Sequence, residues 1–144
     1  MMLYVDTSAL VKLYVEEPMS DKLADAVHAA EAVATSLVAY VEARAAFARA
    51  RRETRLSPSA YRQVLEAFLE DWGRYVVVEV TDRLVRHAGE LAAHRALRGY
   101  DALHLASALS LQEHVASKIS FLAFDHALVQ AARRENLHIH TLGE

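Results

Sequence analysis

Short apolar runs that alternate with helical patterns constrain the fold of this chain more than any other feature. The runs are rich in β-branched and aromatic residues, as expected for buried strands. We assign strands to residues 3–5, 32–35, 75–78, 119–124 and 138–140. Strands that are apolar along their whole length and alternate with helices form parallel sheets covered on both faces. The sequence therefore predicts an α/β protein, a three-layer α/β/α sandwich with a central, mostly parallel sheet.

Capping residues, prolines and glycines place the helices between these strands. The residues expected to cap the starts of helices are Ser20, Ser36, Ser57 and either Thr81 or Asp82. The residues expected to end helices are Pro18, Gly73 and Gly99. The last two helices are expected to cover residues 100–114 and 125–135. Each predicted connection between consecutive strands therefore contains at least one helix, which is what a parallel sheet requires.

The composition is that of an ordered globular protein, with 53% hydrophobic and 24% charged residues. A length of 144 residues suits one domain, so we expect residues 1–144 to form a single domain. The absence of cysteine excludes a disulfide framework, a thiolate zinc site and a cysteine nucleophile. The opening apolar run is too short for a signal sequence or a membrane span, so we expect a cytoplasmic protein. The net charge of −3 argues against a surface that binds nucleic acid throughout but allows a local basic patch.

Four acidic residues stand apart from the others, many of which fall where a solvated helix face is expected. Asp6 follows the first strand directly and Asp125 ends the fourth. Both should therefore lie at the carboxyl edge of the sheet, where open α/β folds bind ligands. Glu42 falls on an otherwise apolar helical stripe, where an unpaired buried carboxylate would cost several kcal/mol. Asp101 lies in the first turn of a helix whose later turns are apolar.

These four acids together indicate a site for a cation. Carboxylates that converge raise one another's pKa or destabilise the fold unless a cation neutralises them. Oxygen ligands without any cysteine favour Mg²⁺ or Mn²⁺ over zinc. Ions held in this way activate water and stabilise the oxygens of an in-line phosphoryl displacement.

Each acid also has a simpler interpretation when it is taken alone. Asp6 and Asp125 could cap the helices that follow them, and an acid in the first turn of a helix is a common stabilising device. An aspartyl phosphatase would also have an Asp after its first strand. That class usually has a second Asp two residues later, where this chain has Ser8, and a lysine after a later strand, whereas Lys118 precedes its strand.

The segments around the four acids resemble those of PIN domains. The segment LYVDTSAL at residues 3–10 resembles the opening strand, Asp and small polar pair of that family. The segment RGYDALHLASA at residues 98–108 resembles the helix of the third acid, and VAYVE at residues 38–42 matches the helix of the second. The segment FLAFDHAL at residues 121–128 resembles the strand and acid that close the site. The likeness spans almost the whole chain in the same order and is closest to the VapC toxins of VapBC pairs.

This resemblance implies a metal-dependent endoribonuclease that hydrolyses RNA phosphodiester bonds and is the toxin of a type II toxin–antitoxin pair. It implies that Asp6, Glu42, Asp101 and Asp125 are the catalytic, metal-binding acids, with Mg²⁺ or Mn²⁺ as the cofactor. Ser8 would be a secondary polar contact to a metal-bound water or a phosphate, or else a first-turn cap. The resemblance also implies an antitoxin partner, a homodimer, and cleavage that leaves 5′-phosphate and 3′-hydroxyl ends.

One position departs from the family pattern. Many relatives have Thr or Ser two residues before the fourth acid, whereas this chain has Ala123. The missing hydroxyl weakens the prediction that Asp125 binds a metal directly, and it leaves a catalytically inactive PIN-like binding module as the alternative. Because all four acids are retained, the sequence favours the nuclease.

Two further features have more than one interpretation. A basic cluster at a helix end, made up of Arg49, Arg51, Arg52 and Arg55, either contacts RNA phosphates or lies in solvent, where the helix dipole favours it. His104 either orients one of the carboxylates or is a partly buried histidine with hydrogen-bond partners of its own.

Overall fold

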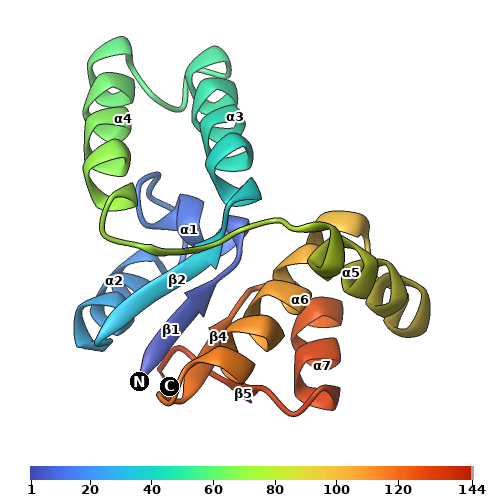
Figure 1. Ribbon diagram of the computed structural model, residues 1–144. Helices are drawn as coiled ribbons and strands as arrows, with labels where there is room; N and C mark the ends of the chain where they lie inside the picture. The colour runs from blue at the N-terminus through green and yellow to red at the C-terminus, as the bar shows by residue number, and fades with distance from the viewer. Residues whose placement is uncertain (144) are drawn as a thin grey trace.

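The computed structural model describes residues 1–143, in which helices lie on both sides of one sheet (Figure 1). The strands are β1 (Met2–Val5), β2 (Ala32–Ser36), β3 (Val76–Val78), β4 (Ile119–Leu122) and β5 (His138–Ile139). The helices are α1 (Thr7–Lys12), α2 (Ser20–Ala29), α3 (Val38–Arg52), α4 (Pro58–Trp72), α5 (Asp82–Arg95), α6 (Gly99–His114) and α7 (His126–Arg134). Every strand and helix expected from the sequence is present.

The five-stranded sheet is parallel at each of its pairings, with the strand order β3-β2-β1-β4-β5. β1 is the central strand, and its Tyr4 lies in register with Ala34 of β2 on one side and Phe121 of β4 on the other. Parallel neighbours need crossover connections, and the helices supply them on both faces of the sheet. The predicted α/β/α sandwich is confirmed.

Alternating side chains of β1 divide the core into two layers. Tyr4 is fully buried on the face covered by α5, α6 and α7, where it stacks on Phe121 with ring centroids 5.5 Å apart. Leu3 and Val5 are buried on the opposite face, against α1 to α4. Because both faces of β1 are covered, its carboxyl end is one of the few parts of the strand that a ligand can approach.

Helices α3 and α4 form a pair that extends beyond the sheet (Figure 1). Phe68 of α4 is fully buried at the centre of an aromatic cluster, with ring centroids 5.3 Å from Phe47 of α3 and 5.5 Å from Tyr14, just after α1. Tyr40 of α3 and Trp72 of α4 also pack against Phe68. The cluster therefore holds α3, which carries Glu42, at a defined position relative to α1.

Some of the predicted helix boundaries are confirmed. The hydroxyls of Ser57 and Thr81 cap α4 and α5 by accepting hydrogen bonds from the backbone N–H groups of Ala60 and Leu84, at 3.0 and 3.1 Å. α4 ends at Trp72, directly before Gly73, as expected.

Two other predicted helix starts were displaced by one or two residues. Met19, with a left-handed φ of 79°, precedes α2, and the Ser20 hydroxyl donates instead to the carbonyl of Lys12. Ser36 is the last residue of β2 and Leu37 holds the cap position of α3, although the Ser36 hydroxyl accepts a 3.3 Å hydrogen bond from the N–H of Val38.

The ends of α5 and β4 also differ from expectation. α5 ends at Arg95, where Ala96 adopts the left-handed conformation, and Gly99 is the first residue of α6 instead of a break. β4 ends at Leu122, so Asp125 follows the strand after a two-residue gap and does not end it. None of the helices within residues 1–143 has the length and hydrophobicity needed to cross a bilayer.

Candidate active site

The four predicted acids lie together in one pocket at the carboxyl edge of the sheet. The pocket has a volume of about 560 Å³. Its polar lining comprises Asp6, Thr7, Ser8, Lys12, Glu17, Glu42, Arg98, Tyr100, Asp101, His104 and Asp125. The carboxylates come from four separate elements, so only the tertiary fold brings them together.

Asp6 occupies the junction between β1 and α1 and is 4% exposed. One of its oxygens accepts a 3.0 Å hydrogen bond from the backbone N–H of Ala9, which makes Asp6 the cap of α1. The Ser8 hydroxyl lies 3.0 Å from both carboxylate oxygens of Asp6 and donates to them. Burial raises the pKa of Asp6, and the nearby His104 ring together with the hydrogen bonds from Ala9 and Ser8 offsets part of that increase. The cap interpretation of Asp6 is therefore correct, and it coexists with a position in the pocket.

A chain of hydrogen bonds holds Glu42 in place from the protein interior. The Thr7 hydroxyl donates to Oε1 of Glu42 at 2.5 Å, so Thr7 must accept the 2.9 Å hydrogen bond from Nε2 of His104. The Nδ1 atom of His104 lies 2.8 Å from the hydroxyl of Tyr4, which is buried in the core. In a neutral ring with its proton on Nε2, Nδ1 accepts from Tyr4. The core of the sheet thus fixes the orientation of the His104 ring.

The same contacts decide the charge of Glu42. Burial alone would raise its pKa, but the contacts of Glu42 with His104 and Thr7 outweigh burial, so the pKa is lowered. Glu42 is therefore ionised at neutral pH. His104 is 2% exposed, and both of its sequence interpretations hold, since it is a buried histidine with its own partners and it lies 3.5 Å from a carboxylate.

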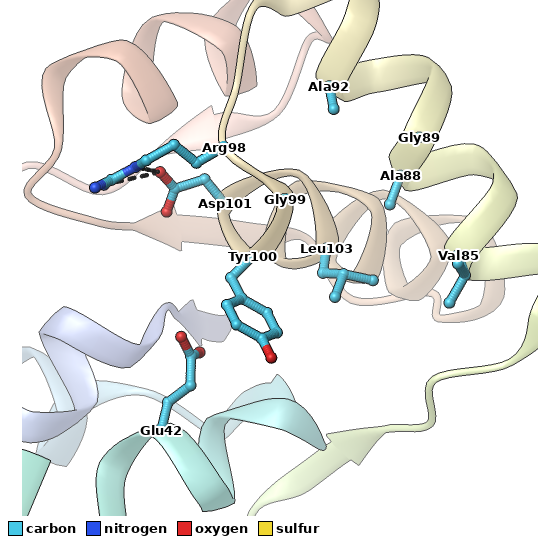
Figure 2. Close-up of a pocket in the computed structure, with 10 residues that line it drawn as sticks. All are labelled: Glu42, Val85, Ala88, Gly89, Ala92, Arg98, Gly99, Tyr100, Asp101 and Leu103. Carbon is cyan, nitrogen blue, oxygen red and sulfur yellow. Dashed lines mark hydrogen bonds and ion pairs between the residues drawn. The ribbon is translucent and has the colours of Figure 1, made fainter. Parts of the chain in front are cut away.

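Arg98 joins the two remaining acids. Its guanidinium lies 3.2 Å from Asp101 and 3.7 Å from Asp125 (Figure 2 shows the first pair). Asp125 also caps α7 by accepting a 2.9 Å hydrogen bond from the N–H of Leu128. The Arg98 side chain is 81% exposed, so this positive charge lies at the rim of the pocket instead of being enclosed in it.

The donor set suits a hard divalent cation, because its charged donors are carboxylate oxygens. Within residues 1–143, however, no three Asp, Glu or His side chains are arranged closely enough to hold an ion as they stand. Protein groups occupy them instead: Thr7 and His104 hold Glu42, and Arg98 holds Asp101 and Asp125. A cation held by Asp101 and Asp125 would therefore compete with Arg98 for their carboxylate oxygens.

Sequence reasoning placed the acids and Ser8 in the pocket but missed two residues that control them. Thr7 was visible only as one member of a small polar pair after Asp6. Arg98 was visible only as a residue three positions before Asp101, the i,i+3 spacing at which helical side chains meet. The basic cluster near residue 50 lies outside the pocket, and two of its members, Arg49 and Arg55, form ion pairs with Glu53.

Comparison with known proteins identifies the family. The family described as PIN domain matches residues 3–134. The chain belongs to the PIN domain family. Ribonuclease VapC45 and Ribonuclease VapC49, from two strains of Mycobacterium tuberculosis, are each 39% identical to it over 110 residues, which make up 76% of this chain and 76% of each relative.

Solved structures share the fold at low sequence identity. The structure of VapBC-1 from nontypeable Haemophilus influenzae has a TM-score of 0.66 and 17% identity, covering 97% of both chains. VapBC2 from Rickettsia felis, bound to a DNA fragment from its promoter, has a TM-score of 0.64 and 13% identity, covering 97% of this chain and 98% of that one. FitAcB from Neisseria gonorrhoeae has a TM-score of 0.64 and 16% identity, covering 98% and 97%. The topology described above is thus that of a known fold.

Proposed function

We propose that this protein is an endoribonuclease that hydrolyses RNA phosphodiester bonds, and that it is the toxin of a VapBC-type toxin–antitoxin pair. The observation that carries the proposal is the meeting of Asp6, Glu42, Asp101 and Asp125 in one pocket of a PIN domain. The 39% identity to two proteins named as VapC ribonucleases supports the same function. No observation on residues 1–143 favours the alternative of an inactive binding module.

The four acids would hold the divalent ion, for which we propose Mg²⁺ or Mn²⁺. A bound ion of this kind supplies Lewis acidity at the phosphate and lowers the pKa of water. The protein's own contribution is orientation. Ser8 and the N–H of Ala9 fix both oxygens of Asp6, which makes Ser8 a positioning residue for this acid. Thr7 and His104 fix Glu42 in its ionised form.

Arg98 has two roles in this proposal. Without an ion it neutralises Asp101 and Asp125, which lowers the repulsion between them. With a cation held by the acids, the exposed guanidinium would be available to an RNA phosphate, whose geometry suits its planar fork.

We further propose an antitoxin partner, a homodimer and a cytoplasmic location. Relatives of the same fold were solved as VapBC assemblies, which supports an antitoxin partner. Leu37 and Val41, at the start of α3, are 48% and 60% exposed, and apolar residues of this size on a surface suit a contact with protein. The proposed cleavage leaves 5′-phosphate and 3′-hydroxyl ends.

The metal site can be tested without knowledge of the RNA target. We expect Mn²⁺ to bind wild-type protein in a calorimetric titration and to raise its melting temperature by roughly 5–10 °C at about 100 times Kd. Asp101→Asn should lose both signals, because the amide carries no charge. Asp82→Asn is the matched control, since Asp82 is likewise in the first turn of a helix and paired with an arginine, but lies outside the pocket.

Two results would count against this metal site. If wild-type protein shows neither heat nor a shift in melting temperature with Mn²⁺ or Mg²⁺, the proposal of a metal-dependent nuclease fails. If Asp101→Asn binds the ion as tightly as wild type, the ion binds somewhere else on the protein.

Arg98→Ala tests whether the guanidinium competes with the ion. The variant should bind Mn²⁺ about 2- to 5-fold more tightly than wild type, because the exposed ion pairs that it removes are worth about 0–1 kcal/mol. Arg86→Ala is the control, since Arg86 forms a similarly exposed pair with Asp82 on α5. Calorimetry gives both affinities, and an unchanged or weaker affinity in Arg98→Ala would rule out the competition.

A further inference from the structure

A second cleft, of about 690 Å³, opens beside the acidic pocket between α5 and the start of α6 (Figure 2). The two cavities share part of their lining, namely Glu42, Arg98, Tyr100 and Asp101. The rest of the cleft is lined by Val85, Ala88, Gly89, Ala92, Gly99 and Leu103. The shared residues make the cleft continuous with the proposed site of phosphate cleavage.

The wall of the cleft away from the acids is apolar and built from small side chains. Ala88, Gly89 and Ala92 leave room along the side formed by α5, and a Cβ added at Gly89 would meet nothing within 4 Å. The volume lies within the range of roughly 300–1,000 Å³ that is typical of small-molecule sites. An apolar cavity with a charged rim suits a flat group that has apolar faces and is joined to a charged backbone.

Tyr100 is the exposed aromatic residue of this cleft. Its side chain is 55% exposed, and among the described residues it takes part in none of the aromatic ring pairs that stabilise the core. Figure 2 shows its ring beside the carboxylate of Glu42, projecting from the helix that carries Asp101. A ring that is exposed next to a phosphate-cleaving site provides a surface on which a nucleobase can stack.

We propose that the cleft binds the unstacked base next to the scissile phosphate, with Tyr100 as the stacking surface. This inference rests on the proposed function, because the acidic pocket must hold the phosphate. A strand whose phosphate lies at the acids carries its neighbouring base into the adjoining cavity, and the Arg98 guanidinium lies at their common rim. Proteins that read single-stranded RNA commonly stack splayed bases on aromatic rings.

The test separates binding of the base from binding of the phosphate. We would measure the affinity of the full chain, in Ca²⁺ at low temperature, for two labelled strands by fluorescence anisotropy. One strand is an eight-nucleotide RNA of randomised sequence, and the other is an abasic strand of the same length. Gel electrophoresis confirms that both strands stay intact. Wild-type protein should prefer the base-bearing strand by roughly 5- to 150-fold for one stacked base.

Three variants and one control locate this preference. Tyr100→Ala should remove this preference by weakening the binding of the base-bearing strand far more than that of the abasic strand. Tyr100→Phe should keep the preference, since stacking needs the ring and not the hydroxyl. Gly89→Leu should also remove it by filling the cleft, and the open space at that position allows the variant to fold. Gln63→Leu, which adds leucine at an exposed position of α4, should behave as wild type.

Four results would overturn the inference. If wild type binds both strands equally in the presence of the ion, the proposed function stands and the base pocket does not. If Tyr100→Ala lowers the affinity for both strands by the same factor, Tyr100 only supports the acidic pocket. If Gly89→Leu changes the oligomeric mass in light scattering while the preference remains, the cleft belongs to a second protein chain. If wild type binds neither strand, the proposed function fails and the inference fails with it.

Discussion

Replacing Asp101 by asparagine is expected to reduce RNA cleavage by on the order of 10²–10³-fold or more while the protein stays folded. The substitution keeps the shape of the side chain but removes a negative charge from the rim of the acidic pocket, where Asp101 pairs with Arg98. Stability should change by only about 1 kcal/mol, because the exposed guanidinium contributes little and the rest is the loss of an acid from the first helical turn. The variant should therefore lose most of its cleavage activity while it keeps nearly all of its stability.

The measurement uses total cellular RNA with Mg²⁺, followed by mapping of the new 5′ ends by sequencing. Asp82→Asn is again the matched control and should cleave at the same sites and the same rate as wild type. Circular dichroism and a urea denaturation curve establish that both variants are folded. An Asp101→Asn variant that cleaves as fast as wild type at the same sites would remove Asp101 from the active site.

Replacing Phe68 by alanine is expected to lower the free energy of unfolding by about 3–5 kcal/mol. Phe68 is fully buried and contacts aromatic rings on α3, on α4 itself and next to α1, so its loss leaves a cavity that three elements would have to close. The loss is a large fraction of the stability of a typical small domain, which is about 5–15 kcal/mol. Because α3 carries Glu42, ion affinity should also fall.

Urea denaturation followed by circular dichroism gives the change in stability. Leu69→Ala is the control, since Leu69 is the next residue of α4 and is 45% exposed, and it should change stability by less than about 0.5 kcal/mol. If Phe68→Ala destabilises the protein no more than Leu69→Ala, then the aromatic cluster does not hold α3 against α1 as the packing indicates.

Most of the fold could be predicted because its signals are local. Each strand is a short apolar run, and the alternation of runs with helices leads to a parallel sheet by a general rule of connectivity. The same rule placed Asp6 at the carboxyl edge of the sheet, since a residue that directly follows a parallel strand can lie nowhere else. The positions of Glu42 and Asp101 in the pocket were predicted from the resemblance to PIN domains, with an apolar stripe around Glu42 as the local signal.

Helix boundaries were less predictable because several side chains compete for the same role. Ser20 has the chemistry of a cap, yet its hydroxyl bonds to Lys12, which only the path of the chain between α1 and α2 brings near. Ala96 ends α5 in a left-handed conformation that the identity of an alanine does not suggest. Such choices depend on small energy differences that neighbouring elements settle.

The sequence by itself determined the α/β class, the parallel sheet and the acids that are candidates for the site. Only the tertiary structure decided how those acids are held. Thr7 meets Glu42 across 35 positions of sequence and His104 across 97, and Arg98 reaches Asp125 from a different helix. The physical reason is range: apolar periodicity and capping act between residues a few positions apart, whereas hydrogen bonds and ion pairs form between whichever groups the packed chain brings within about 3–4 Å.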